Sequence, residues 1–206
     1  MRGILIGLAL ALAAPAAWAQ TQQQHDWCYS PTATYDQTID GCTAVIQSTQ
    51  VTPASKAAAY YDRGLAYYHK GLYDQSIADN TAAIALKPDY AFAYDNRGNA
   101  YDSKGLYDQA IADHSQAIAL TPGDALDYNN RGLAYANKGL YDQAIGDYIR
   151  AIALKPDYAL AYENRGVVYE KKGSRDQAVA DYRAALKIDP NLKLSLDGLT
   201  RLGATP

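Results

Sequence analysis

The 206-residue chain has very little of several residue types that usually build a protein core. It contains one Phe, one Met, two Trp and two Cys, whereas Tyr occurs 19 times. A formal net charge of −3 shows no basic excess, and this excludes a strongly basic nucleic-acid binder. The hydrophobic share of 49% excludes a disordered tail. The excess of Tyr over Phe indicates that one pattern is copied several times.

The N-terminus carries an apolar run that is too short to span a bilayer. Met1 and Arg2 give a positive start, Ile4 to Ala14 is apolar, and Ala-Trp-Ala at 17–19 matches a leader cleavage site. We therefore expect a signal peptide over residues 1–19, cleaved near Ala19, and a periplasmic or secreted bacterial protein. No later stretch is long and apolar enough to cross a membrane.

The two cysteines, Cys28 and Cys42, favour a disulfide, because an exported chain folds in an oxidising compartment. Such a bond would close a short loop and stabilise the fold by roughly 3 kcal/mol. Two buried free thiols are the alternative. A metal site is not expected from two thiols and three scattered histidines.

Four short features recur in phase at a spacing of 34 residues. Every unit contains, in this order, the pairs Arg-Gly, Lys-Gly and Asp-Gln and a single Pro. The Arg-Gly pairs begin at Arg63, Arg97, Arg131 and Arg165. Each unit is typical of a helix pair, because the Gly after Lys ends a first helix and the Pro cannot continue a second.

Helix boundaries in the second unit are expected at 91–104 and 107–120. Acidic or amide residues near the unit boundaries are expected to cap the helices that follow, and these are Asp89, Asp124, Asp157 and Asn191. Thirteen tyrosines occupy four recurring positions, which we interpret as packing positions between helices. Tyr61 and Tyr68 fall outside them.

The second unit carries Tyr94, Gly98, Tyr101, Ala110, Ala117 and Pro122. With these residues the chain resembles the tetratricopeptide repeat (TPR) family from Ala57 to Leu192. Arg stands before the Gly where the family usually has Leu, which looks like an Arg-Gly variant of bacterial members. The resemblance implies an all-α, right-handed superhelix (an α-solenoid) of antiparallel helix pairs, with repeats at 57–90, 91–124, 125–158 and 159–192.

Both ends of the repeat array are predicted to be capped. Residues 20–56 form the N-terminal cap, in which Tyr35 to Ser48 is interpreted as a lone second helix because Tyr35–Ile39 copies Tyr73–Ile77. Residues 191–206 are predicted to form a capping helix and tail, with leucines on one stripe.

Each Arg of the Arg-Gly pair has an Asp in phase with it. In antiparallel helices Arg63 is level with Asp79, and the turn into the next unit brings Arg97 level with Asp79 as well. We therefore expect a structural ladder in which an aspartate bridges two arginines, and a ligand-binding row of arginines is the alternative. The ladder residues are Arg63, Asp79, Arg97, Asp113, Arg131, Asp147, Arg165 and Asp181.

The TPR resemblance implies a groove along the first helices that holds an extended peptide. The matching positions, unit by unit, are Tyr61, Asp62, Leu65, Tyr68, His69; Phe92, Asp95, Asn96, Asn99, Asp102; Leu126, Asn129, Asn130, Leu133, Asn137; and Leu160, Glu163, Asn164, Val167, Glu170, Lys171. Asn side chains at one recurring position can bond a peptide backbone through both the oxygen and the amide. A solvated helix face is the alternative.

Family members that grip an acidic C-terminus use Lys and Arg together with Asn in this row. Here the Asn is present and the basic residues are nearly absent, so a neutral or basic polypeptide is the better electrostatic match. No phosphate loop, paired-His motif or nucleophile elbow occurs, so neither catalysis nor a cofactor is expected. The main hypothesis is an exported binding scaffold. A self-associating structural solenoid (a homo-oligomer) and a cell-wall or carbohydrate binder are the alternatives.

Overall fold

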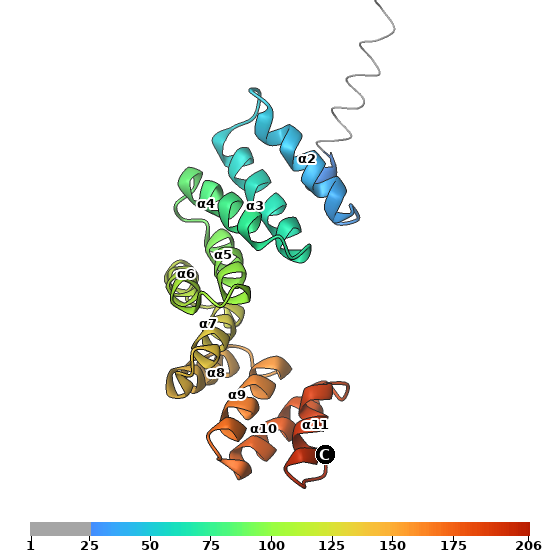
Figure 1. Cartoon of the computed structure of the whole chain (residues 1–206), viewed down its shortest axis with the longest axis vertical. Coiled ribbons are helices and arrows are strands. Elements are labelled where there is room, and N and C mark those ends of the chain that lie inside the picture. The colour runs from blue at the N-terminus through green and yellow to red at the C-terminus, as the bar shows by residue number, and fades with distance from the viewer. Residues whose placement is uncertain (1–25) are drawn as a thin grey trace, which may run out of the picture. The chain divides into compact units, whose positions relative to one another are not determined.

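The structure is a computed structural model that describes residues 26–206, so the signal peptide expected over residues 1–19 lies outside the described residues. Between residues 26 and 206 the backbone forms helices and turns and no strand (Figure 1). The expected all-α class is therefore confirmed. The chain divides into two compact units, one that ends at Pro88 and one that comprises Asp89–Pro206. No helix of the described part is long and apolar enough to cross a membrane.

The first unit contains three long helices, α2 (Tyr35–Gln47), α3 (Pro53–His69) and α4 (Tyr73–Leu86). Helix α3 packs against both α2 and α4 (Figure 1). Helix α2 begins with a capping box, because the Thr34 hydroxyl accepts from the Gln37 backbone N–H while the Gln37 side chain accepts from that of Thr34. The start of α2 at Tyr35 agrees with the expected lone second helix.

A disulfide joins Cys28 to Cys42, with the two Cα atoms 4.5 Å apart, as the sequence predicts. Cys42 lies on α2, and both cysteines are buried in a small core with Val45 and Ala59 of α3. The disulfide therefore fixes the irregular segment 28–33 next to α2 and α3.

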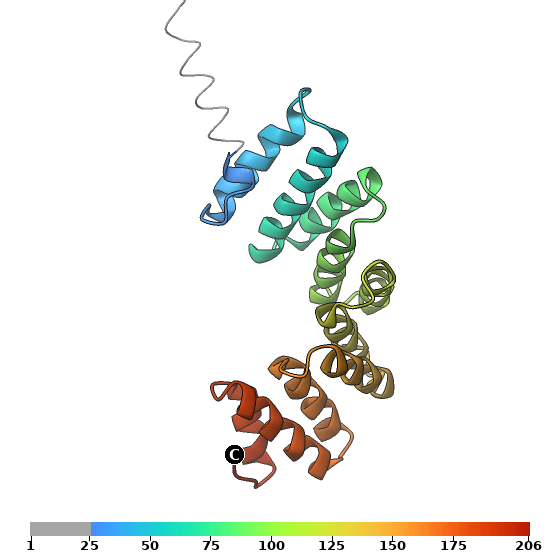
Figure 2. The same cartoon turned by 180° about the vertical axis from the view of Figure 1, so that it is seen from behind.

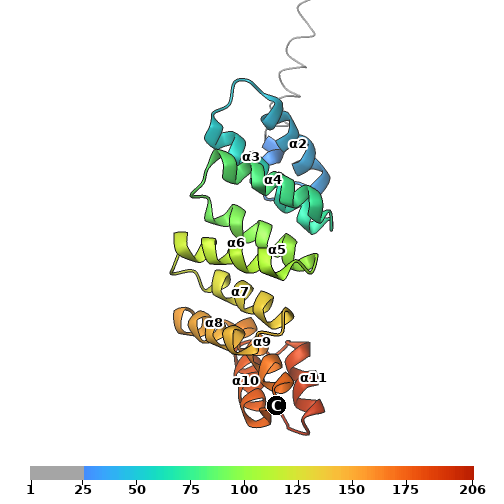
Figure 3. The same ribbon diagram turned by 60° about the vertical axis from the view of Figure 1, so that its left-hand side comes forward.

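The second unit contains the remaining repeats as seven helices, α5 (Ala91–Ser103), α6 (Tyr107–Leu120), α7 (Ala125–Asn137), α8 (Tyr141–Leu154), α9 (Ala159–Lys171), α10 (Arg175–Ile188) and α11 (Lys193–Arg201). Each helix packs against the next along the chain (Figure 3). The odd-numbered helices also contact one another in the order α5, α7, α9, α11. Figure 2 shows the red α11 packed against the last orange helices, where it covers the end of this unit.

The turn inside each repeat is made by a glycine with a left-handed backbone. Gly71 has φ +73° and Gly105 has φ +74°, a conformation that other residues adopt only with strain. The backbone N–H after each glycine donates to a carbonyl near the end of the preceding helix, from Leu72 to Tyr67 and from Leu106 to Tyr101. These bonds satisfy carbonyls that the helix end would otherwise leave open.

The expected helix caps are wrong at three of the four positions. The residues that precede α5, α9 and α11 are Tyr90, Tyr158 and Leu192, so Asp89, Asp157 and Asn191 each lie one residue too early. Only Asp124 occupies the cap position itself, where its carboxylate accepts from the backbone N–H of Leu126 at 2.9 Å. The 34-residue period places Asp124 in the column of Tyr90 and Tyr158.

Small residues on one helix of a repeat face large buried rings on the other. A Cβ atom at Gly132 would lie 2.8 Å from the ring of Tyr148, and one at Gly166 would lie 2.9 Å from the ring of Tyr182. Both tyrosine side chains are fully buried. The helices approach closely only because glycine leaves room for the ring, which explains why these positions recur in phase.

An arginine of the first helix binds an aspartate of the second helix in every repeat. The Nε and Nη2 atoms of Arg131 donate to the two carboxylate oxygens of Asp147, both at 2.7 Å. The same two-pronged pairs join Arg63 to Asp79, Arg97 to Asp113 and Arg165 to Asp181. Such paired hydrogen bonds between a guanidinium and a carboxylate are among the stronger polar contacts in proteins.

Tyrosine rings flank the same arginines. The guanidinium carbon of Arg131 lies 5.7 Å from the ring centre of Tyr128 and 5.9 Å from that of Tyr135. Arg63 and Arg165 have equivalent pairs of rings, and Arg97 lies over Tyr94. Two of the recurring tyrosine positions therefore enclose the arginine, and each ring face attracts its charge.

In the expected ladder each aspartate also contacts the arginine of the next repeat, and this part of the prediction is wrong. Because the fork to Asp147 uses Nε and Nη2 of Arg131, only Nη1 faces the preceding repeat, and it donates to the hydroxyl of Ser115 at 3.1 Å rather than to Asp113. Arg63 does the same with Thr43 of α2 at 2.8 Å. At these two junctions a neutral hydroxyl two residues beyond the aspartate position makes the link, whereas the matching position before Arg165 is Ile149, which has no hydroxyl.

We predict that Asp147→Ala lowers the melting temperature by several degrees in circular dichroism. The pair with Arg131 exposes only 20% and 10% of its side chains, so losing the carboxylate leaves a largely buried charge and costs about 3 kcal/mol. Asp142→Ala is the matched control, because Asp142 lies on the same helix in an exposed pair with Lys172 and should change little. Equal melting temperatures for the two variants would contradict this prediction.

Candidate functional site

Exposed apolar side chains recur along the first helices of the second unit. Phe92, Leu126, Leu160 and Leu194 occupy the second position of α5, α7, α9 and α11, and are 61%, 47%, 46% and 49% exposed. We call these four residues the apolar row. The first three were expected in the groove, whereas Leu194 was missed, although it lies 34 residues after Leu160.

Polar side chains beside the apolar row join each first helix to the next. The amide nitrogen of Asn130 donates to Asp95 at 3.0 Å, and that of Asn164 donates to Asn129 at 3.0 Å. The hydroxyl of Ser195 in α11 continues the series, because it donates to Glu163 at 2.7 Å. Asn130 and Asn164 were expected to bond a peptide, but they are already hydrogen-bonded between helices.

The remaining groove positions are either hydrogen-bonded within the protein, buried, or exposed. Asn99 donates to Asp95 at 3.0 Å, and Asn137 donates to Asp102 at 3.0 Å. Asn96 is buried, whereas Leu133 is 38% exposed and adds apolar surface on α7. The surface open to a partner is thus mainly the apolar row and Leu133, with Asp95 one turn from Phe92 and Asp102 near the opposite end of α5.

A buried histidine supports Asp95 from the second helix of its repeat. His114 is fully buried, and its Nδ1 lies 3.0 Å from Oδ1 of Asp95. Burial by itself would raise the pKa of Asp95, but the hydrogen bond and charge of His114, with the amides of Asn130 and Asn99, hold that pKa below its usual range. Asp95 therefore stays ionised beside Phe92.

Glu170 at the C-terminal end of α9 is matched by a cation. Arg201 of α11 donates to both of its oxygens at 3.0 Å, and the Tyr182 hydroxyl donates at 2.6 Å. The hydrogen bond from Arg201 lowers the pKa of Glu170. This end of the groove face is therefore less negative than the sequence alone suggests.

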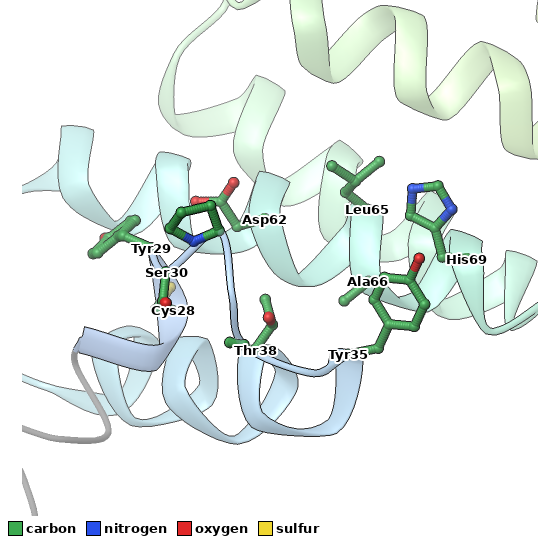
Figure 4. Close-up of a pocket in the computed structure, with 11 residues that line it drawn as sticks. Cys28, Tyr29, Ser30, Tyr35, Thr38, Asp62, Leu65, Ala66 and His69 are labelled. Atoms are coloured by element: carbon green, nitrogen blue, oxygen red, sulfur yellow. The ribbon is translucent and has the colours of Figure 1, made fainter.

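A cleft of about 370 Å³ lies within the first unit, between the disulfide-fixed segment, α2 and α3 (Figure 4). Asp62, Leu65 and His69 line it from α3, and these residues were among the expected groove positions. Tyr29 and Tyr35 line it from the opposite side and were missed, because they lie in or next to an irregular segment without a repeat pattern. Tyr61 is half-buried, and Tyr68 packs against the rings of His69 and Tyr73.

Burial raises the pKa of Asp62 in this cleft to about 6. Burial, followed by the charge of Asp62, raises the pKa of the Tyr29 hydroxyl. At the other end the rings of Tyr35 and His69 stack with centroids 5.1 Å apart and planes 10° from parallel. No group of three metal-ligating side chains gathers anywhere among residues 26–206.

Family models match most of the repeat region. A model described as TPR repeat matches residues 98–139 and 137–173, and models described as tetratricopeptide repeat match residues 44–91 and 159–192. The crystal structure of MamA is 30% identical, with a TM-score of 0.68 over 76% of this chain and 89% of that chain. The chain belongs to the tetratricopeptide repeat family.

Other solved TPR structures are similar as well. YrrB, described as a TPR protein with an unusual peptide-binding site, is 22% identical with a TM-score of 0.67 over 81% of this chain and 84% of that chain. The first TPR of Spaghetti (RPAP3), solved with the HSP90 peptide SRMEEVD, is 27% identical with a TM-score of 0.54 over 55% of this chain and 90% of that chain. No curated protein sequence matches the chain.

One carboxylate beneath the TPR groove face was missed. Asp127 of α7 is 5% exposed and occupies the position at which the other repeats have the fully buried Ala59, Ala93 and Ala161. Its carboxylate accepts from the Thr121 hydroxyl at 3.0 Å. Burial, followed by the charge of Asp95, raises its pKa to about 6. An acid in a column of alanines is the sequence signal that could have revealed it.

We predict that Asp127→Ala raises the melting temperature by a few degrees at pH 8. The folded-state pKa of about 6 exceeds the ordinary value of 3.8, so the ionised carboxylate destabilises the fold above pH 6. The gain should shrink as pH falls from 6 towards 4, where the carboxyl becomes protonated in the folded and the unfolded state. The exposed Asp157→Ala serves as control, and an unchanged or lower melting temperature at pH 8 would refute the prediction.

Proposed function

We propose that this TPR protein is an exported, non-catalytic scaffold that binds an extended segment of another protein along the apolar row of its second unit. The observation that carries the proposal is the row itself, four large apolar side chains exposed in phase on successive first helices. Complete burial of a Leu or Phe side chain is worth about 1.5–3 kcal/mol, so each of these half-exposed side chains contributes about 1 kcal/mol when a partner covers it. Similar TPR structures whose descriptions name a peptide-binding site or a bound peptide support this reading.

The charge beside the row favours a neutral or basic partner. Asp95 is ionised beside Phe92, where His114 offsets part of its charge, and Asp102 near the opposite end of α5 accepts only from the neutral amide of Asn137. An acidic segment like the HSP90 peptide SRMEEVD, which the Spaghetti TPR binds, would bring carboxylates against these two. Like charges in contact oppose binding, so the discrimination is against acidic partners.

Export and the absence of catalysis are part of the same proposal. The leader-like N-terminus supports export, and the Cys28–Cys42 disulfide is of the kind that persists in oxidising compartments. The buried His114 is engaged by Asp95, inside the helix packing. In this reading the protein supplies a binding surface and performs no chemistry.

Self-association is the second candidate, because a second copy could also bury the apolar row. In that case size-exclusion chromatography with light scattering would show a defined oligomer that the substitutions in the row dissociate. A monodisperse monomer favours the binding scaffold. These outcomes separate the two readings before any partner is known.

Two series of synthetic peptides test the proposed binding directly. Both have leucines at the same spacing, and the residues between the leucines are Lys in one series and Glu in the other. We expect the Lys series to bind at least about tenfold more tightly than the Glu series, and Leu126→Ser with Leu160→Ser to weaken binding by at least about tenfold in calorimetry. Ile149→Ser is the matched control, because Ile149 is 49% exposed on the second helix of its repeat. Binding that survives the row substitutions, or a preference for Glu, would overturn the proposal.

A further inference from the structure

The cleft in the first unit exists because the N-terminal cap is half a repeat. In α7 and α9 the Asn at one recurring position donates to the preceding first helix, as Asn130 does to Asp95 and Asn164 does to Asn129. In α3 this position is Asp62, and the element before it is the lone second helix α2. The irregular segment 28–33 takes the neighbouring place and leaves a cleft of about 370 Å³ against α3 (Figure 4).

The cleft holds one carboxylate that the fold does not pair. Among the described residues Asp62 has no hydrogen-bond or ion-pair partner, whereas the neighbouring Arg63 is committed to Asp79 and Lys70 to Asp36. Burial raises the pKa of Asp62, because the fold removes water from this carboxylate and supplies no cation. A bound cation would relieve that cost.

The rest of the lining suits an apolar stem that ends in a positive charge. Leu65 lies between Asp62 and His69 along α3, and the two outer residues are about 10 Å apart at the rise of an α-helix. Figure 4 shows Tyr29 towards the Asp62 end and Tyr35 beside His69 at the other end. Leu65 and Ala66 offer apolar contact to a stem, and the tyrosine faces attract a cation.

We propose that this cleft is a binding site for an alkyl-linked cation, with its charge on Asp62 and its stem along Leu65 towards Tyr35. A lysine-like ammonium, carried by a polypeptide or by a free diamine, has this chemistry. A metal ion lacks the further ligands it would need, and an anion would meet Asp62 directly. The site is separate from the apolar row and does not rest on the proposed function.

The disulfide holds one wall of the site in place. Tyr29 follows Cys28 directly, and its hydroxyl donates to the backbone carbonyl of Ser55 at 3.2 Å. The wall is thus tied to α2 by a covalent bond and to α3 by a hydrogen bond. Binding by the oxidised protein should therefore be tighter than binding by the reduced protein.

Titration of the oxidised protein with Nα-acetyl-lysine amide, followed by NMR of the Tyr29, Tyr35 and His69 rings, tests the site. We expect saturable shifts of these rings, and none with the uncharged Nα-acetyl-norleucine amide. Asp62→Asn should weaken binding at least about tenfold. It introduces the residue that the other three repeats carry at this position, so the fold should tolerate it. Asp157→Asn, an exposed change on the second unit, is the control.

A parallel titration with 1,5-diaminopentane separates the two sources of the cation. Stronger binding of the lysine amide assigns the site to a polypeptide side chain, and stronger binding of the diamine assigns it to a free amine. The proposal is overturned if neither ligand shifts the rings, if norleucine amide binds equally well, or if Asp62→Asn binds as the unchanged protein does. Substitutions in the apolar row should leave this titration unaltered, so the two proposals fail independently.

Discussion

The arginine between two tyrosine rings is the contact on which each repeat depends. In three repeats the guanidinium lies between two rings of its own helix, and in all four it grips an aspartate of the second helix through two parallel hydrogen bonds. A guanidinium that exposes only 16–20% of its side chain is stable because the carboxylate and the rings replace most of the water it has lost. The requirement accounts for the Arg-Gly pair and for two recurring tyrosine positions. It also fixes the height of one helix against the other.

Between repeats the polar contacts of the second unit are weaker and more varied. Neutral hydroxyls and amides, such as Ser115 with Arg131 and Asn164 with Asn129, join one helix pair to the next. These contacts involve the Asn residues that were expected to bind a peptide, so those side chains are already hydrogen-bonded within the protein. What is left for a partner is apolar, and so the proposed recognition rests on burial along the row with charge acting as a filter.

The N-terminal cap shows how an incomplete repeat creates a distinct surface. In the second unit the preceding first helix packs polar side chains against this position, as Asp95 does against Asn130, but before α3 residues 28–33 present the side chains of Tyr29 and Ser30 to Asp62 instead. The disulfide makes this substitute wall durable without a helix of its own. The disulfide-bonded segment that covers the core at this end therefore also forms one wall of a cleft lined by aromatic side chains.

The repeat period was enough to determine the repeat helices of the second unit, the boundaries of α5 and α6 within about a residue and the partner of each arginine within its own repeat, whereas α3 begins at Pro53, four residues before the expected repeat start at 57. Those features depend on local turn chemistry and on antiparallel pairing over a short loop, which the 34-residue pattern records directly. The cap positions, the Arg131 contact with Ser115 and the use of Asn130 and Asn164 between helices were decided by the tertiary structure. They depend on the stagger and rotation of one helix pair against the next, and a shift of one residue exchanges one hydrogen-bond partner for another. The cleft was also beyond the sequence, because segment 28–33 has no period and is placed by the disulfide and by its packing on α3.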